Sequence, residues 1–485
     1  MKKRYCLFKV LTVLLLLVVV ATYCIKGRQD TISYLALGDV FFNYLQSFYY
    51  FFDTAIFILV VGGFYGLLNR IPAYKGIVSS IADKVSSNSR LFVSIMTIVF
   101  ALVSSLTGFN VLMLMFIPFV VSIILLLGYD KLVAISATIG GTIVGFIGGI
   151  FLTFKDAASQ YEVSYATFDK LVGLEGNWSN LFPKILLLVV AVGLLVFYIL
   201  SYIKRIERDG SSYPLTKSDN LFFEVKDRTG KKITSSNGKA LNWPFFAIMV
   251  IFFVLLVLGY LPWKDLFGID CFDKFHTWLT GLKIGDYVVW TSLISSSFSA
   301  FGTWSSLGNY IMATVLMVLF GAILQLVYRV KFEDSMDGFI YGVKKMIPAA
   351  MIAMLAYCVL VCSYNNGFIE TIIANASKSF GDNVIIQSLI TMLGSVLNVD
   401  LYYTSAGVFT SIVSNLGDKA NLSIYAVMFQ SLYGLVQLVG PTSLLLIVGL
   451  SYLEVPYKRW LQYIWRFIVE LLIVILVILM IVSLL

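Results

Sequence analysis

The sequence predicts an all-α polytopic membrane protein, with about nine full transmembrane helices plus two opposed re-entrant hairpins in inverted repeats. Of the 485 residues, 59% are hydrophobic and only 13% are charged, whereas a soluble domain carries about 25% charged residues. The apolar runs at 10–25 and 471–485 are long enough to cross most of a hydrocarbon core. In addition, short apolar arms joined by polar stretches occur at corresponding places in two halves of the chain.

The first half, 1–203, is predicted to contain full spans, an interfacial segment and a pair of arms. Its predicted spans are 6–25, 51–69, 133–152 and 181–203. The segment 31–50 mixes aromatic and polar residues, which is typical of an interfacial helix. The paired arms lie within 91–127 and precede the glycine-rich span.

A hydrophilic, basic linker at 204–242 separates this half from the second, 243–485, which repeats the plan. The spans predicted in the second half are 243–260, 307–328, 347–363, 422–450 and one from about 463. The loop 329–345 between two of them is predicted to be cytoplasmic. The second pair of arms, 384–397 and 401–416, points the opposite way from the first. Such inverted repeats place a substrate site near the midplane in many secondary transporters.

Lys and Arg residues indicate the orientation of these predicted spans in the membrane. They gather in short loops and in the linker, which are therefore predicted to be cytoplasmic. The chain is then a multi-pass protein of the cell membrane, with its N-terminus in the cytoplasm and its C-terminus outside. The net charge of +8 is read as this topology signal, so no nucleic-acid partner is expected.

The polar stretches between the arms are candidate binding sites. In the first pair the candidates are Ser105, Thr107 and Asn110; in the second they are Asn398, Asp400, Thr404 and Ser405. Arms this short favour re-entrant hairpins, whose polar tips would lie at membrane depth. The alternative is that 398–405 is a surface loop between two full spans, and that the serines serve helix packing.

Each pair of arms precedes a span that is predicted to be interrupted. Gly141 and Gly145 lie in a glycine-dense span, where another backbone can approach or the helix can unwind; close helix packing is the alternative. In the second half, Gln437 and Thr442 flank Pro441, which removes a backbone N–H. An unwound binding segment and a plain proline kink both fit this pattern.

Motifs of enzymes and of nucleotide-driven pumps are absent from the sequence. It contains no GxxxxGK[ST], GxSxG, HExxH or CxxC. The five cysteines form no metal-ligand pattern, and the single histidine, His276, is expected to be solvated. No enzyme activity and no cofactor are expected. Transport driven by a Na⁺ or H⁺ gradient is the function that remains.

The order of several segments resembles the C4-dicarboxylate anaerobic carrier family, in its YfcC-like branch. These segments are FFDTAIFILVVGGFYGLLNR, GYDKL, DGFIYGVKKMIPAAMI, NNGFIETI and GPTSLLLIVGLSYLEVPYKRW. The family belongs to the ion-transporter superfamily. The resemblance therefore implies inverted repeats, opposed hairpins, elevator-type motion and a homodimer. It also implies substrates such as dicarboxylates, amino acids or amino-acid conjugates.

The departures from the family pattern fall at the hairpin tips. GFNVLMLMFIP and GGIFLTF stand where the family carries a Thr-Pro tip and an Asn-Pro break, and NVDLYYTSAG replaces a Ser/Gly-rich tip. Asp400 is the odd residue, suited to carry a proton or to pair with a substrate ammonium. The expected function is ion-coupled symport or exchange of small charged metabolites, with amino acids or dicarboxylates as the expected substrates. A non-transporting paralogue and a membrane-embedded assembly or enzyme protein are the alternatives.

Overall fold

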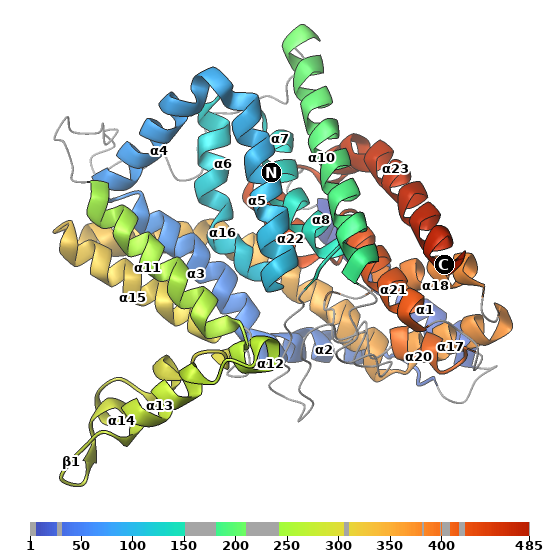
Figure 1. Ribbon diagram of the computed structural model, residues 1–485. Coiled ribbons are helices and arrows are strands. Elements are labelled where there is room, and N and C mark those ends of the chain that lie inside the picture. Colours follow the sequence, from blue (N-terminus) through green and yellow to red (C-terminus); the bar gives the residue numbers. More distant parts are fainter. Residues whose placement is uncertain are drawn as a thin grey trace.

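The structure is a computed structural model. It describes residues 6–26, 32–150, 181–209, 242–304, 310–380, 383–397, 399, 408–416 and 422–484. Helices dominate this part of the chain, as predicted (Figure 1). Within it, six helical segments are long and apolar enough to cross a membrane. They are α1 (Cys6–Lys26), α4 with α5 (Pro72–Val85, Ser89–Thr107), α10 (Leu181–Asp209), α11 (Asn242–Tyr260), α16 (Phe332–Asn365) and α23 (Tyr457–Leu484).

Further apolar elements are shorter or bent. The segment predicted to be interfacial forms α2 (Leu37–Tyr50), which meets α3 (Phe52–Leu68) at an angle of 66°. The shorter ones are α6 (Ile117–Leu126), α7 (Lys131–Ile135), η3 (Ser136–Gly140), α8 (Gly141–Ile147), α15 (Ile311–Val327), α18 (Val384–Val396), α21 (Leu422–Gln437) and α22 (Leu444–Tyr452). The all-α polytopic membrane fold is thus confirmed.

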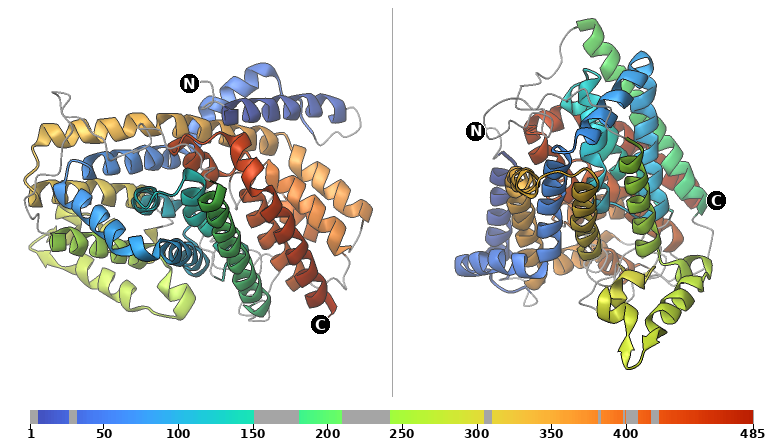
Figure 2. Two further views of the ribbon diagram at one scale, coloured as in Figure 1. Left: turned by 90° about the horizontal axis from the view of Figure 1, so that it is seen from above. Right: turned by 90° about the vertical axis from the view of Figure 1, so that its left-hand side faces the viewer.

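One group of helices is organised around α16. The helices α1, α2 and α3 pack against it, and α15 and α11 continue this layer beyond α3 (Figures 1 and 2). Glycines make the α3–α16 contact possible: a Cβ on Gly66 would collide with the Gly338 carbonyl, and one on Gly342 with the Gly62 carbonyl. Backbone therefore meets backbone along this seam.

A second group contains both pairs of arms and the helices that follow them. The helix α5 packs on α8, α21 packs on α8 and α18, and α10 and α23 cover them. The α16–α22 contact joins this group to the first.

The prediction of a loop at 329–345 is wrong for most of that segment, which is helical. α16 starts at Phe332 and runs without interruption to Asn365. Charged residues in its first turns gave the segment a loop-like composition, but Gly338 and Gly342 pack it against α3 over that length. Packing of these glycines, which hydropathy does not register, keeps the segment helical.

Between α11 and α15 the chain forms a projecting arm. It consists of α12 (Trp263–Phe267), α13 (Cys271–Gly281), the hairpin β1–β2 (Lys283–Ile284, Tyr287–Val288), α14 (Val289–Leu293) and η6 (Ser296–Ser299) (Figure 1). His276 lies on α13, half-buried, with Nδ1 at 2.8 Å from the Ser299 hydroxyl oxygen.

Candidate functional site

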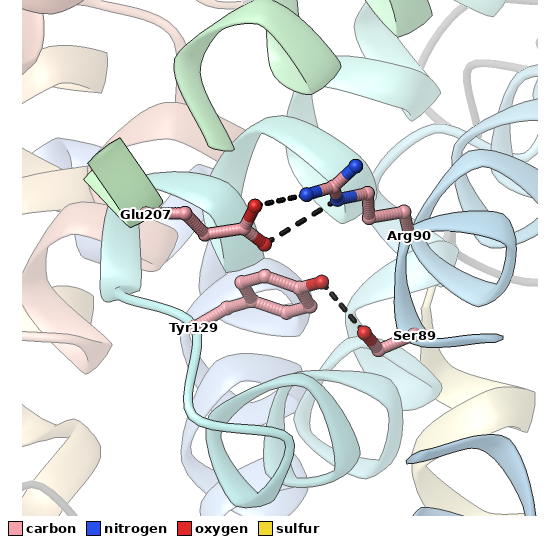
Figure 3. Close-up of polar contacts among 4 residues, drawn as sticks. All are labelled: Ser89, Arg90, Tyr129 and Glu207. Atoms are coloured by element: carbon pink, nitrogen blue, oxygen red, sulfur yellow. Dashed lines mark hydrogen bonds and ion pairs between the residues drawn. The ribbon is translucent and has the colours of Figure 1, made fainter. Parts of the chain in front are cut away.

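The first pair of arms begins and ends on the same side of the protein. Ser89, at the start of α5, lies with its hydroxyl 2.7 Å from that of Tyr129, which follows α6 (Figure 3). Next to this contact, Arg90 forms an ion pair with Glu207 near the end of α10 (Figure 3). Between the two ends, α5 stops at Gly108, whose φ of 68° is left-handed, and the chain returns through η2 (Val111–Met115) into α6. This path is that of a hairpin.

The second pair of arms enters from the opposite side. Both α18 and α20 (Thr410–Val413) pack against α17 (Phe368–Phe380), which connects α16 to α18. α18 has 13 residues, about 20 Å of helix, which is too short for a core of about 30 Å. Past its end, Val399 is buried and its carbonyl is 3.5 Å from the Tyr433 hydroxyl of α21. The first arm therefore ends inside the protein.

The tip of the first hairpin holds the end of α8. The Ser105 hydroxyl donates to the Gly148 carbonyl at 3.0 Å, and the Ile150 N–H donates to the Ser105 carbonyl at 3.0 Å. From α21, the Gln430 amide donates to the carbonyls of Phe146 and Gly149 at 3.2 and 2.7 Å. Gly148 and Gly149 follow the last residue of α8, so their carbonyls have no helical donors and these side chains satisfy them.

Gly141 and Gly145 act where α8 crosses α5. A Cβ on Gly141 would lie 2.9 Å from the Thr97 carbonyl oxygen, and one on Gly145 would collide with the Ala101 carbonyl. The helix is π-helical just before this crossing, over Ser136–Gly140. Close helix packing, one of the two readings of these glycines, is what the structure displays.

The predicted interruption of the long second-half span lies between α21 and α22. α21 ends at Gln437 and α22 starts at Leu444. In the break, the Thr442 hydroxyl donates to the Val396 carbonyl at 2.7 Å, at the end of α18. The first pair of arms is therefore hydrogen-bonded to the end of α8, and the second to the break between α21 and α22.

α21 connects the two junctions. The Phe146 and Tyr433 rings pack edge to face at 5.5 Å, and a Cβ on Gly434 would lie 2.7 Å from an Ile147 side-chain carbon. From Gln430, at the first junction, to Gln437, at the second, is about 10 Å of helix. The two hairpins thus converge on one region, which we call the junction region: the ends of α5, α8, α18 and α21 with the start of α22.

Several buried polar atoms of the junction region lack a hydrogen-bond partner in the described structure. They are Ser104 Oγ, Asn110 Oδ1, Gln430 Oε1, Gln437 Nε2 and Ser443 Oγ. Leaving such a group unsatisfied costs about 1–3 kcal/mol. In a binding protein, this is the chemistry that a ligand or an ion completes.

The predicted site residues divide into three sets. Ser105, Gly141, Gly145, Asn110, Gln437 and Thr442 all border the junction region. Thr107 belongs to local structure, because its hydroxyl donates to the Val103 carbonyl and accepts from the Phe109 N–H. Asn398, Asp400, Thr404 and Ser405 lie outside the described residues.

The sequence reasoning missed a buried pair of charged residues, Asp130 and Lys131, at the start of α7. Asp130 accepts from the Val133 N–H at 3.0 Å and from the Tyr202 hydroxyl at 2.8 Å. Lys131 is 2% exposed and donates to the Leu453 carbonyl, at the end of α22, at 2.6 Å. The signal was available, since the GYDK sequence places two charges directly after an apolar arm.

Helix ends give the junction region its electrostatic character. α5, α8, α18 and α21 all end there, and the C-terminal end of a helix carries about half a negative charge. The negative end of these helix dipoles favours a small cation, whereas the start of α22 at Ser443 favours an anionic group. Among the described residues there is no cluster of three or more His, Cys, Asp or Glu for a transition metal.

Comparison with known proteins agrees with the all-α membrane fold. A model of the C4-dicarboxylate anaerobic carrier family matches residues 28–484. An uncharacterized protein of Haemophilus influenzae is 21% identical over 418 residues, which is 85% of this chain and 72% of the relative. A solved structure of Neisseria gonorrhoeae MtrF, described as illuminating a class of antimetabolite efflux pumps, has a TM-score of 0.41 and 13% identity, covering 97% of this chain and 94% of its own. The family match covers nearly the whole chain, which therefore belongs to the C4-dicarboxylate anaerobic carrier family, a family of membrane transporters.

Proposed function

We propose that the protein is an ion-coupled secondary transporter, a symporter or exchanger of small charged metabolites, and that the junction region is its binding site. The observation that carries this proposal is the set of orphaned buried polar atoms where the two pairs of arms meet the end of α8 and the break between α21 and α22. A protein that only packed there would gain stability from apolar residues at Asn110 and Gln437.

The substrate we propose is a dicarboxylate or an amino acid. The Gln437 amide, the Ser104 and Ser443 hydroxyls and the start of α22 offer donors for a carboxylate. The negative ends of the α5, α8, α18 and α21 dipoles favour Na⁺ or a substrate ammonium. Na⁺ fits this second set better than H⁺, since no described side chain among the orphaned atoms titrates near neutral pH.

We further propose an elevator-like movement of a homodimer. In this scheme the group that contains both hairpins moves as a unit against the group built on α16. The division into two tightly packed groups supports the idea, as does the glycine seam within the α16 group.

Uptake into proteoliposomes tests the proposal. Purified protein should accumulate labelled dicarboxylates or amino acids when a Na⁺ or pH gradient is imposed, each gradient applied alone. Failure of every substrate and gradient combination to exceed protein-free liposomes would favour the non-transporting alternative.

Gln437→Leu and Gln430→Leu form a matched pair for locating the site. Gln437 Nε2 is an orphan, so Gln437→Leu should remove uptake while leaving the protein as stable as before, or more stable. Gln430 holds the end of α8, so Gln430→Leu should lower stability as well as uptake. Normal uptake by Gln437→Leu would place the binding site elsewhere.

A further inference from the structure

A groove of about 780 Å³ opens between α1 and α16 on the outer surface of the protein. Thr12 and Val13 of α1 line one wall, Ile347, Pro348 and Met351 of α16 line the other, and Lys9 lies at its edge. Val13, Ile347 and Met351 are 56%, 44% and 40% exposed. In a bilayer such residues face lipid, so the groove is open to acyl chains.

The charged end of the groove lies at the level of the membrane surface. From Lys9 to Lys26 is about 25 Å of helix, and from Lys344 to Asn365 about 32 Å. Both lengths approximate the hydrocarbon core, so Lys9 and Lys344 mark the same boundary on neighbouring helices. Lys344 lies four residues before Pro348, and therefore on the face of α16 that lines the groove.

These lysines have no acidic partner in the described structure. Neither Lys9 nor Lys344 forms an ion pair there, and both are exposed. Pro348 lies inside α16 and cannot donate the backbone hydrogen bond that the Lys344 carbonyl would otherwise accept. Lys9 is thus part of the groove lining, and Lys344, whose carbonyl has no helical donor, lies one helical turn beyond it.

We propose that this groove binds one anionic phospholipid. Its acyl chain lies between α1 and α16, its phosphate lies between Lys9 and Lys344, and a headgroup hydroxyl donates to the Lys344 carbonyl. Half of the site comes from α1, which precedes the part of the chain that the family model matches. The site is separate from the junction region and does not depend on the transported substrate.

Lipid titration of the purified full chain tests this site. Delipidated protein in detergent is titrated with phosphatidylglycerol or phosphatidylcholine, and binding is followed by native mass spectrometry and by the unfolding midpoint. Phosphatidylglycerol should bind and raise the midpoint, and phosphatidylcholine should not. Because a lysine near anionic lipid contributes a factor of about five, Lys9→Gln with Lys344→Gln should weaken phosphatidylglycerol binding about 25-fold.

Two further variants separate the groove from general surface charge. Val13→Trp fills the groove at a lipid-facing position and should abolish lipid binding. Lys84→Gln, at an exposed position of α4, should leave lipid binding unchanged. Equal binding of both lipids, or unchanged binding by the double glutamine variant or by Val13→Trp, would overturn the site. So would efficient cross-linking of two Val13→Cys chains in a bilayer, since the groove would then be an interface between copies.

Discussion

The contact between α5 and α8 can be tested by adding a single methyl group. At Gly145 a new Cβ would lie 2.7 Å from both the carbonyl carbon and the Cα of Ala101. At Gly140, a few residues earlier in the same apolar run, the nearest atoms to a new Cβ are 3.8 Å away. Gly145→Ala and Gly140→Ala therefore add the same methyl group. In Gly145→Ala it collides with the backbone of α5, and in Gly140→Ala it lies at ordinary contact distance from its neighbours.

The expected difference follows from these distances. To reach ordinary contact at 3.4 Å, α5 and α8 must separate by at least about 0.7 Å, and by more to clear the nearer Ala101 carbonyl oxygen; overpacking of this kind costs about 1–3 kcal/mol. The hydrogen bond from Ser105 to Gly148 crosses the same contact and would lose part of its 0.5–1.5 kcal/mol. Gly140→Ala should instead stabilise the helix by about 0.5–1 kcal/mol. The two variants should differ by about 1.5–4 kcal/mol.

Reversible unfolding in mixed detergent micelles measures this difference, with uptake assayed on the same preparations. We expect Gly145→Ala to unfold earlier and to transport less, and Gly140→Ala to be about 0.5–1 kcal/mol more stable than the parent and to transport as well as it does. Equal unfolding free energies for the two variants would refute the backbone contact between α5 and α8. Loss of uptake by Gly145→Ala with unchanged stability would instead give Gly145 a direct place in the binding site.

Three further predictions concern the junctions and the threading. Ser105→Ala should cost about 1–3 kcal/mol of stability, because it leaves the carbonyl at the end of α8 buried without its donor; an unfolding midpoint equal to the parent's would contradict this. Lys131→Met should cost about 1.5–3 kcal/mol, because a charged donor leaves the end of α22, whereas Lys84→Met on the surface should cost under about 0.5 kcal/mol. Single cysteines within 220–235 should react with an impermeant reagent only from the cytoplasmic side, and labelling from outside would reverse the predicted orientation.

Much of the architecture could be predicted because hydropathy and helix interruption are properties of local sequence. The first span is predicted at 6–25 and found at Cys6–Lys26, and the predicted break around Pro441 separates α21 from α22. Hydropathy failed at α16, where helix formation depends on glycines 270 or more residues apart in the sequence, such as Gly62 and Gly342. A contact between distant backbones leaves no periodic signal in either segment.

The candidate site was only partly predictable for a related reason. Polar residues at the tips marked where the junctions lie, but not what each side chain does there. Ser105 and Thr107 look alike in sequence, yet Ser105 reaches the end of α8 while Thr107 bonds within its own turn. Gln430, Asp130 and Lys131 hold helix ends contributed by other parts of the chain, and their roles depend on which end lies within reach.

In so apolar a protein, a structural polar side chain can be told from a ligand-binding one by whether its buried polar atoms have hydrogen-bond partners. Every helix that stops inside it leaves carbonyls without donors, and burial makes each of them costly. Ser105 and Thr442 satisfy such carbonyls, so their polarity is explained by the fold alone. Asn110 and Gln437 keep a buried polar atom without a partner in the described structure, and a leucine in either place would remove that cost. An uncompensated amide near the end of α8 and another beside the break between α21 and α22 are features that packing does not explain and that a bound ligand would.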